Sequence, residues 1–313
     1  MPGVTATVVV PVKDGAAHLR ELLPVLAAQV VDGGHEVLAI DSGSTDGSRA
    51  LLEEAGIRTL RIAPEAFDHG LTRNLGVLEA RGRVVVFLTQ DALPADEHLV
   101  RRLVEGLERD ARVAGTFARQ LPRRGADPLT RRDLLGWVAA RLEPRITFVT
   151  DWEQFESLPP LERYALAVFD NVASAVRRET LLEHPFAPSV FGEDLEWGCR
   201  MLRLGHGLAY VPEALVIHSH RRRARALYRR NYLGHRLLHR LFALRTVPDA
   251  AHLLRAAAVA VAGDLRELVR AGAGPASLLA APAQSVAATY GQYRGARDEA
   301  LHRPYPEWAR AAR

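Results

Sequence analysis

The first 120 residues alternate short apolar runs with segments in which leucines recur at helical spacing. Apolar runs of about four to eight residues are typical of buried strands, and a spacing of three to four is typical of amphipathic helices. The pattern predicts strands at residues 6–12, 36–40, 57–62 and 83–88, and helices at residues 18–29, 46–55 and 71–80. Strands that alternate with short helices predict an α/β fold with a doubly wound, mostly parallel sheet.

The rest of the chain has a different pattern. Residues 122–168 are irregular and contain Trp137 and Trp152, so we expect a variable region that shapes specificity. A strand is predicted at residues 171–177, a helix at 193–204, and one or two short strands at 208–218. From residue 221 the pattern is helical to the end, with breaks at Pro248, at 272–275 and at Pro304.

Composition indicates an ordinary globular protein, because 48% of the residues are hydrophobic and 25% are charged. The single cysteine, Cys199, excludes an internal disulfide framework and fits a reducing compartment. No apolar run approaches the ~18 residues of a membrane span, and the first residues lack the pattern of a signal peptide. We therefore expect a cytoplasmic protein.

Polar residues follow three of the predicted strands at the point where each strand ends. They are Lys13-Asp14-Gly15, Asp41-Ser42-Gly43-Ser44 and Thr89-Gln90-Asp91. A single acidic residue at such a position is usually a turn or a helix cap. Since the carboxyl ends of parallel strands meet at one edge of a sheet, three such ends predict a binding site.

The chemistry of that site is constrained by two absences in the sequence. Neither the GxxxxGK[ST] loop of P-loop ATPases nor the GxGxxG loop of dinucleotide-binding enzymes follows the first strand. Carboxylates repel phosphates, but they can hold a base or ribose, or a divalent cation that in turn binds a diphosphate. A nucleotide site built from acidic strand ends is therefore expected.

Six segments occur in a fixed order between about residues 5 and 240. They are PVKDG, AIDSGSTDGS, FDHGLTRNLG, VVVFLTQDALP, FGEDLEWGCRMLRLG and VIHSH. In this order they resemble family 2 glycosyltransferases of the GT-A fold, and FDHGLTRN with FLTQDA is most similar to bacterial rhamnosyltransferase-like members. The resemblance implies an inverting transferase that uses Mn²⁺ or Mg²⁺ and a nucleotide-diphospho-sugar (dTDP-, UDP- or GDP-linked), with a deoxysugar such as rhamnose.

The resemblance also implies a domain division and an acceptor. Residues 1–220 would form the GT-A domain, with a nucleotide half at about 1–120 and an acceptor half at about 121–220. Residues 221–313 would form a basic, then Ala/Leu-rich, helical region. The acceptor would be a hydroxyl of a glycan or of a lipid-linked molecule, in polysaccharide biosynthesis.

Roles for individual residues follow from the resemblance. Asp194 would be the catalytic base, and Asp91 would be both a metal ligand and part of the nucleotide-sugar site. One histidine of VIHSH, His218 or His220, would complete the metal or diphosphate site. The remaining nucleotide-sugar residues would be Asp14, Asp41, Ser44, Arg73 and Gln90. Asn171, Glu193, Trp197 and His220 would lie on the acceptor side or support the site.

Two departures from the family pattern leave alternatives open. Thr89 stands two places before Asp91, where the family usually has a second aspartate, and Lys13 replaces a common asparagine. Asp91 could instead be the cap of a helix beginning near residue 96, and Glu193-Asp194 could serve a helix end. The alternative functions are a non-catalytic sugar-nucleotide or polysaccharide-binding subunit and a nucleotidyltransferase.

The charge of the chain has one notable feature. The formal net charge is +4, and nine arginines with no acidic residue lie between Ala214 and Pro248. This basic amphipathic stretch could contact anionic lipid at the inner face of the membrane, hold acceptor phosphates, or be a solvated face. Aromatic residues are too sparse for single-strand stacking, so we expect no nucleic-acid partner. The Ala/Leu-rich residues 251–288 are a candidate homodimer surface.

Overall fold

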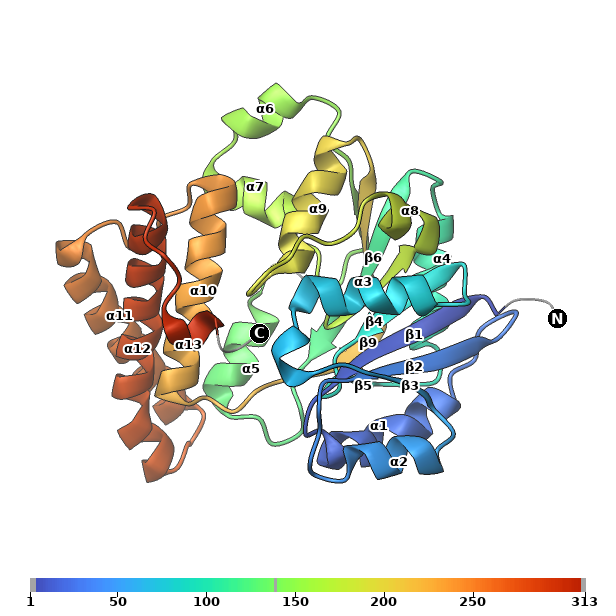
Figure 1. Ribbon diagram of the computed structural model, residues 1–313. Helices are drawn as coiled ribbons and strands as arrows, with labels where there is room; N and C mark the ends of the chain where they lie inside the picture. The colour runs from blue at the N-terminus through green and yellow to red at the C-terminus, as the bar shows by residue number, and fades with distance from the viewer. Residues whose placement is uncertain (1–3, 138–139, 311–313) are drawn as a thin grey trace.

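The computed structural model describes residues 4–137 and 140–310, and their strands form one mixed sheet (Figure 1). The sheet has nine strands, in the order β3-β2-β1-β4-β8-β6-β9-β5, with β7 paired to β9. The strands are β1 (Ala6–Val12), β2 (His35–Asp41), β3 (Arg58–Arg61), β4 (Val84–Leu88), β5 (Leu93–Pro94), β6 (Val113–Leu121), β7 (Arg145–Thr147), β8 (Ala173–Arg177) and β9 (Gly207–Ile217). β1 to β4 run parallel, β8 is antiparallel to both neighbours, and β6 and β9 are parallel. The predicted α/β fold with a mostly parallel sheet is confirmed.

Helices cover both faces of this sheet. They are α1 (Ala16–Ala27), α2 (Ser48–Glu54), α3 (His69–Glu79), α4 (Leu99–Glu108), α5 (Pro128–Leu135), α6 (Trp152–Ser157), α7 (Pro160–Ala167), α8 (Arg178–Glu183) and α9 (Glu193–Arg203), with a 3₁₀ turn at Pro64–Ala66. Side chains of α1, α2 and α4 form one core, and those of α3, α8 and α9 form the other. Burial from both sides explains why β4, with the sequence VVVFL, is apolar at every position.

One central strand was not predicted. β6 lies between β8 and β9, but its sequence, VAGTFARQL, contains a glycine and an arginine that interrupt the apolar run. Gly115 is needed there because a Cβ would lie 2.7 Å from the ring of Phe169. The segment at 208–218, expected as one or two strands, is the single strand β9.

The C-terminal region is helical, as the pattern predicts. It consists of α10 (Ala224–Phe242), α11 (Ala250–Arg270), α12 (Pro275–Ala300) and α13 (Glu307–Arg310), and Figure 1 shows α11 and α12 at the side of the molecule away from β1 to β3. Leu237 and Phe242 of α10 pack into the same core as α9. The division at residue 220 remains a prediction. None of the described helices is both long and apolar enough to span a membrane.

Candidate active site

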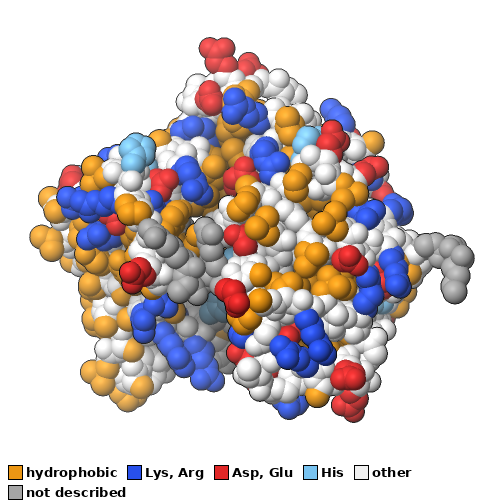
Figure 2. Space-filling view, viewed as in Figure 1, with side chains coloured by type: hydrophobic (Ala, Val, Ile, Leu, Met, Phe, Trp, Pro, Cys, Tyr) orange, Lys and Arg blue, Asp and Glu red, His pale blue; other side chains and the backbone are white. Residues whose placement is uncertain are grey.

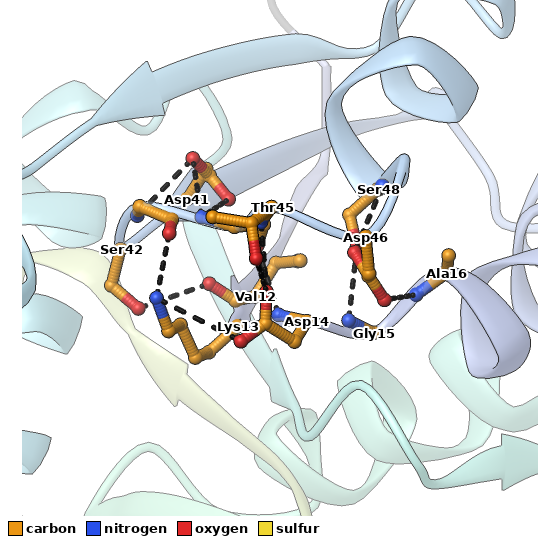
Figure 3. Close-up of polar contacts among 12 residues, drawn as sticks. Val12, Lys13, Asp14, Gly15, Ala16, Asp41, Ser42, Thr45, Asp46 and Ser48 are labelled. Carbon is orange, nitrogen blue, oxygen red and sulfur yellow. Dashed lines mark hydrogen bonds and ion pairs between the residues drawn. The ribbon is translucent and has the colours of Figure 1, made fainter.

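The loops that follow β1 and β2 lie against each other and are joined by hydrogen bonds (Figure 3). The backbone N–H of Asp14 donates to Ser44 Oγ at 2.9 Å, and Asp14 Oδ1 accepts the N–H of Thr45 at 2.8 Å. Lys13 Nζ donates to the carbonyl oxygen of Gly43 at 2.6 Å. The side chain of Asp14 is 45% exposed, so it remains open to a ligand. The structure therefore brings together two of the predicted nucleotide-binding residues, Asp14 and Ser44.

Asp41, the third of these residues, is fully buried at the end of β2. Its carboxylate accepts the N–H of Ser44 at 3.1 Å and pairs with Arg49 Nε at 2.7 Å. Burial works to raise the pKa of Asp41, but the hydrogen bonds from Ser44 and Arg49 outweigh burial and lower this pKa. Asp41 thus shapes the loop, and a base or ribose that bound its carboxylate would take the place of Arg49.

Gln90 connects the end of β4 to the loop after β1. Its Oε1 accepts the N–H of Lys13 and its Nε2 donates to the carbonyl oxygen of Lys13, both at 3.0 Å. Gly15 leaves room for this amide, since a Cβ there would lie 2.2 Å from Gln90 Oε1. The carbonyl oxygen and the NH₂ group of Gln90 both bond to the backbone of Lys13. The predicted part of Gln90 in nucleotide binding would therefore be to position the loop of Lys13.

A cluster of possible metal ligands lies beside this loop. Asp91 Oδ2 is 3.5 Å from His218 Nε2 and 3.5 Å from His220 Nδ1. The three ligand atoms lie within 4.8 Å of one another, and one of them is a carboxylate oxygen. Imidazole and carboxylate are both ligands of divalent metals, so the residues fit a divalent cation. The predicted juxtaposition of Asp91 with the histidines of VIHSH is present.

The residues of this cluster shift one another's pKa values. Burial works to raise the pKa of Asp91, but His218 and His220 outweigh burial and lower it. Burial, together with the neighbouring His218 and Arg230, lowers the pKa of His220 to about 4. The ring of His220 is therefore neutral at physiological pH, which a metal ligand must be.

The alternative of a helix cap at Asp91 does not agree with the structure. The helix that follows, α4, begins at Leu99 after His98, and the N–H of His98 is accepted by Asp96. Asp91 instead faces the two histidines. Its position is explained by the cluster and not by the helix.

Glu193 and Asp194 are the first residues of α9 and point in different directions. Glu193 Oε1 is 3.0 Å from Arg73 and accepts Asn171 Nδ2 at 3.1 Å, in a site where Glu193 is 4% exposed. Asp194 accepts the backbone N–H of Asn171 at 3.0 Å and that of Leu195 at 2.8 Å. Glu193 is thus held in a buried ion pair, while Asp194 is bound only through backbone donors.

The surroundings of Asp194 alter its acidity. Burial and the neighbouring carboxylates of Glu193 and Asp170 raise the pKa of Asp194 to about 8. Burial also works to raise the pKa of Glu193, but Arg73 and His69 outweigh it and lower that pKa. Two adjacent carboxyl groups whose pKa values are driven apart are typical of sites where one acts as an acid or base.

Two residues of this site were missed from the sequence. Gln120 donates through Nε2 to Asp170 Oδ2, and Gln120 Oε1 lies 2.8 Å from His218 Nδ1. Asp170 also accepts the N–H of Val172 at 2.9 Å. Because β8 is antiparallel, its first residues lie at the edge where the parallel strands end, and the N–H of Thr89 donates to the carbonyl oxygen of Val172. The polar pair Asp170-Asn171, directly before this strand, could have indicated from the sequence that Asp170 belongs to the site.

Two predicted site residues are too deeply buried to contact a ligand directly. Arg73 was predicted beside the base pocket, but it is buried, pairs with Glu193 and donates to the carbonyl oxygen of His69. Trp197 was predicted on the acceptor side or in support of the site. It is fully buried, so it cannot reach an acceptor, and its Nε1 donates to the carbonyl oxygen of His184. Arg73 thus holds Glu193 at the start of α9, and a supporting role of Trp197 behind the site stays a prediction.

The arginine-rich stretch is not a uniform solvated face. Arg222 pairs with Asp133 and lies 3.7 Å from Asp264, and Arg236 pairs with Glu299 at 2.8 Å. These contacts attach α10 and the loop before it to α5, α11 and α12. Arg221, Arg223 and Arg225, by contrast, are exposed. Only part of the stretch is free to meet a partner.

A cavity of about 510 Å³ adjoins the histidine cluster. Its lining includes His220, Arg123, Arg124 and Arg221, together with apolar residues of α11 and α12. Arg123 donates to the backbone oxygen of Asp91 at 2.8 Å, so this wall is fixed to the loop that carries Asp91. The C-terminal helices therefore complete one side of a basic cavity next to the site.

Comparison with known proteins identifies relatives of this chain. The model of the family described as Glycosyl transferase family 2 matches residues 7–169. The O-antigen chain rhamnosyltransferase RfbN of Salmonella typhimurium LT2 is 28% identical over 232 residues, which cover 72% of this chain and 70% of RfbN. WbaN of Salmonella anatum, also named an O-antigen chain rhamnosyltransferase, is 30% identical over 63% of this chain and 60% of WbaN.

Solved structures share the fold. The mannosyltransferase PcManGT of Pyrobaculum calidifontis, in complex with GDP-Man and Mn²⁺, has a TM-score of 0.59 at 18% identity, over 96% of this chain and 88% of PcManGT. Glucosyl-3-phosphoglycerate synthase of Mycobacterium tuberculosis has a TM-score of 0.51 at 22% identity, over 79% of this chain and 82% of that chain. The fold is of the GT-A type. Because the family model covers more than half of the sequence, this chain belongs to glycosyl transferase family 2 and is a rhamnosyltransferase-like glycosyltransferase.

Proposed function

We propose that this glycosyltransferase is inverting and metal-dependent, and that it moves a deoxysugar such as rhamnose from a nucleotide-diphospho-sugar to an acceptor hydroxyl. The strongest support is that a candidate cation site and a candidate base lie at the same edge of the sheet. Asp91 with His218 and His220 forms a cation-binding cluster, and Asp194 with its raised pKa is a candidate base. The loops of Asp14 and Ser44 lie beside Gln90 and so beside the cluster.

Donor binding would use the ends of β1, β2 and β4. Asp14 and Asp41 would hold the base and ribose, and Gln90 would keep the loop of Lys13 in place. Asp91 and His218 would hold Mn²⁺ or Mg²⁺, with His220 close enough to assist. The ion, when bound, neutralises the charge that develops on the departing nucleoside diphosphate.

Asp194 would act on the acceptor. The hydroxyl oxygen forms a bond to the anomeric carbon on the side opposite the diphosphate, whose bond to that carbon breaks. The hydroxyl proton passes to the Asp194 carboxylate. A pKa of about 8 makes Asp194 a stronger base than an ordinary carboxylate, which suits proton transfer from a hydroxyl.

The substrates are proposed from the relatives and the cavity. RfbN and WbaN are named O-antigen chain rhamnosyltransferases, which supports rhamnose as the sugar and a saccharide acceptor in polysaccharide biosynthesis. The donor would be dTDP-, UDP- or GDP-linked. The cavity beside His220, with its arginines and apolar wall, suits a glycan or lipid-linked acceptor that carries phosphate. We propose a cytoplasmic enzyme that works at the inner face of the membrane, with homodimerisation through residues 251–288.

The test is release of nucleoside diphosphate from a panel of dTDP-, UDP- and GDP-linked sugars, with and without Mn²⁺. EDTA should abolish turnover, and Mn²⁺ or Mg²⁺ should restore it. Asp91→Asn should weaken nucleoside diphosphate binding chiefly when metal is present. A ligand at a hundredfold excess over its Kd stabilises the fold by about 2.7 kcal/mol, so thermal shifts report the same binding.

Asp96→Asn is a matched control, because Asp96 follows the short strand β5 but accepts a hydrogen bond from the N–H of His98 and pairs with Arg102. It should leave the metal dependence of binding unchanged. Equal nucleotide binding with and without metal in the wild type would remove the metal from the proposal.

A further inference from the structure

A buried chain of hydrogen bonds leads from Asp170 through Gln120 to His218. Gln120 is 7% exposed and His218 is 4% exposed. One oxygen of Asp170 accepts the N–H of Val172, and the other accepts Gln120 Nε2. Gln120 Oε1 faces His218 Nδ1 at 2.8 Å. On its opposite side, His218 directs Nε2 toward Asp91.

The donor and the acceptor of each of these hydrogen bonds follow from the carboxyl group of Asp170. Burial raises the pKa of Asp170. In its ionised form the carboxylate only accepts hydrogen bonds, so Gln120 presents its NH₂ group to Asp170, which is the arrangement in the structure. The carbonyl oxygen of Gln120 then faces His218, and His218 Nδ1 must donate to it. A neutral imidazole has one N–H, so its lone pair is on Nε2, the nitrogen that faces Asp91.

In the neutral ring, the Nε2 lone pair and the Asp91 carboxylate oxygen repel each other unless a proton or a metal cation lies between them. We propose that Gln120, anchored by Asp170, is a positioning residue that fixes the proton of His218 on Nδ1 and aims Nε2 at the metal position beside Asp91. The inference rests on the proposed function in one respect, the placing of the metal at Asp91. It makes His218 the principal imidazole ligand.

His220 lacks such support. Its side chain is 52% exposed, and it approaches Asp91 through Nδ1. Among residues 4–137 and 140–310, no hydrogen bond fixes its second ring nitrogen. Metal-bound histidines generally donate their other N–H to a carboxylate, a carbonyl oxygen or water, and mutation of a protein acceptor lowers metal affinity by about 10–100-fold. His218 has such a protein acceptor in Gln120.

Asp170→Asn tests the direction of the chain. In this variant, the side-chain oxygen at position 170 can still accept a hydrogen bond from the N–H of Val172. The new NH₂ group then faces Gln120. Gln120 must then reverse its amide and present NH₂ to His218 Nδ1, so the ring proton moves to Nε2. The variant keeps the shape of the site and should invert the tautomer. Gln120→Met removes the constraint with no change of charge.

The measurement is the ¹⁵N–¹H correlation spectrum of the histidine rings in metal-free protein at about pH 8.5, two units above the usual imidazole pKa. His218→Gln identifies the His218 signal. The wild type should show the proton on Nδ1, and Asp170→Asn should show it on Nε2. Mn²⁺ affinity, measured by electron paramagnetic resonance with nucleoside diphosphate present, should fall by about 10–100-fold in Asp170→Asn and in Gln120→Met.

Gln29→Met is the matched control, because Gln29 is also buried and bonds Asp96 and Val100 far from His218 in the sequence. It should change melting temperature without changing the tautomer. A wild-type ring with its proton on Nε2 overturns the inference even if no variant folds, as does unchanged Mn²⁺ affinity in both variants. If the wild type binds no Mn²⁺, the proposed metal dependence fails. The tautomer of His218 still tests the hydrogen bonds from Asp170 through Gln120 to His218.

Discussion

To act as the base that we propose, Asp194 must lose its own proton before it takes one from an acceptor hydroxyl. Burial and the carboxylates of Glu193 and Asp170 oppose that loss and place the pKa at about 8. The two backbone N–H groups that Asp194 accepts favour the ionised form but do not outweigh these effects. At neutral pH, Asp194 is therefore less ionised than an ordinary carboxyl group.

The pH dependence of kcat/KM follows from this. Since the base works only when ionised, kcat/KM should rise as pH increases through about 8 and level off above it. Glu193→Gln removes a neighbouring negative charge and leaves Arg73 unpaired, so the rise should move to lower pH. Asp194→Asn should lower kcat by roughly 10²–10⁴ with donor affinity nearly unchanged. Steady-state kinetics across the pH range, with donor binding measured in parallel, check all three.

If Asp194 served only the end of α9, the result would be different. Asp194→Asn would then lose up to about 1 kcal/mol of stability and retain its turnover. A pH profile that is the same in the wild type and in Glu193→Gln would also contradict the assignment of the rise to Asp194.

At the scale of elements, the edge of the sheet explains which residues were predictable. Asp14, Asp41 and Asp91 follow parallel strands, so strand pattern alone placed them at one edge. Asp170 precedes a strand, and it reaches the same edge only because β8 is antiparallel, which no local pattern encodes. Gln120 lies in β6, whose pattern is interrupted by Gly115. Long-range pairing, which depends on the whole fold, decides both positions.

The contact between α10 and α12 depends on glycine. A Cβ at Gly295 would lie 2.2 Å from the backbone oxygen of Tyr232, and α10 cannot yield there without moving its backbone. Gly295→Ala should therefore lower the free energy of unfolding by about 1–3 kcal/mol, even though alanine favours a helix. Denaturant unfolding measures this change.

Gly263 in α11 is the matched control. A Cβ at this position would meet no atom within 4 Å. Gly263→Ala should raise the free energy of unfolding by about 0.5–1 kcal/mol. Similar effects of the two substitutions would show that the helices are not closely packed at Gly295.

At the scale of the whole molecule, the C-terminal helices add a surface with strongly exposed apolar side chains. Leu254 of α11 is 75% exposed and Leu279 of α12 is 82% exposed, and hydrophobic side chains gather over these helices at the left of Figure 2. Arginines lie beside them, at the end of α10 nearest the cavity (Figure 2). Apolar and basic groups on one side suit an anionic lipid surface.

The last prediction concerns binding to such a surface. Arg222 is held by Asp133 and Asp264, whereas Arg221, Arg223 and Arg225, at and just before the start of α10, are exposed and free to contact lipid. Each basic residue near an anionic membrane contributes about 1 kcal/mol, so replacing all three by serine should weaken binding to anionic vesicles by roughly a hundredfold. Vesicle sedimentation at several salt concentrations measures it, and wild-type binding should fall as salt rises.

A control with the same change of charge replaces the exposed Arg61, Arg81 and Arg109 on the nucleotide half by serine. If attraction came from net charge alone, both triple variants would lose binding equally. A specific surface requires that the control retain most of its binding while the 221, 223 and 225 variant loses it. Absence of wild-type binding at physiological salt would exclude lipid as the partner of these arginines. The cavity beside His220 would then be the remaining place for Arg221 to meet an anion.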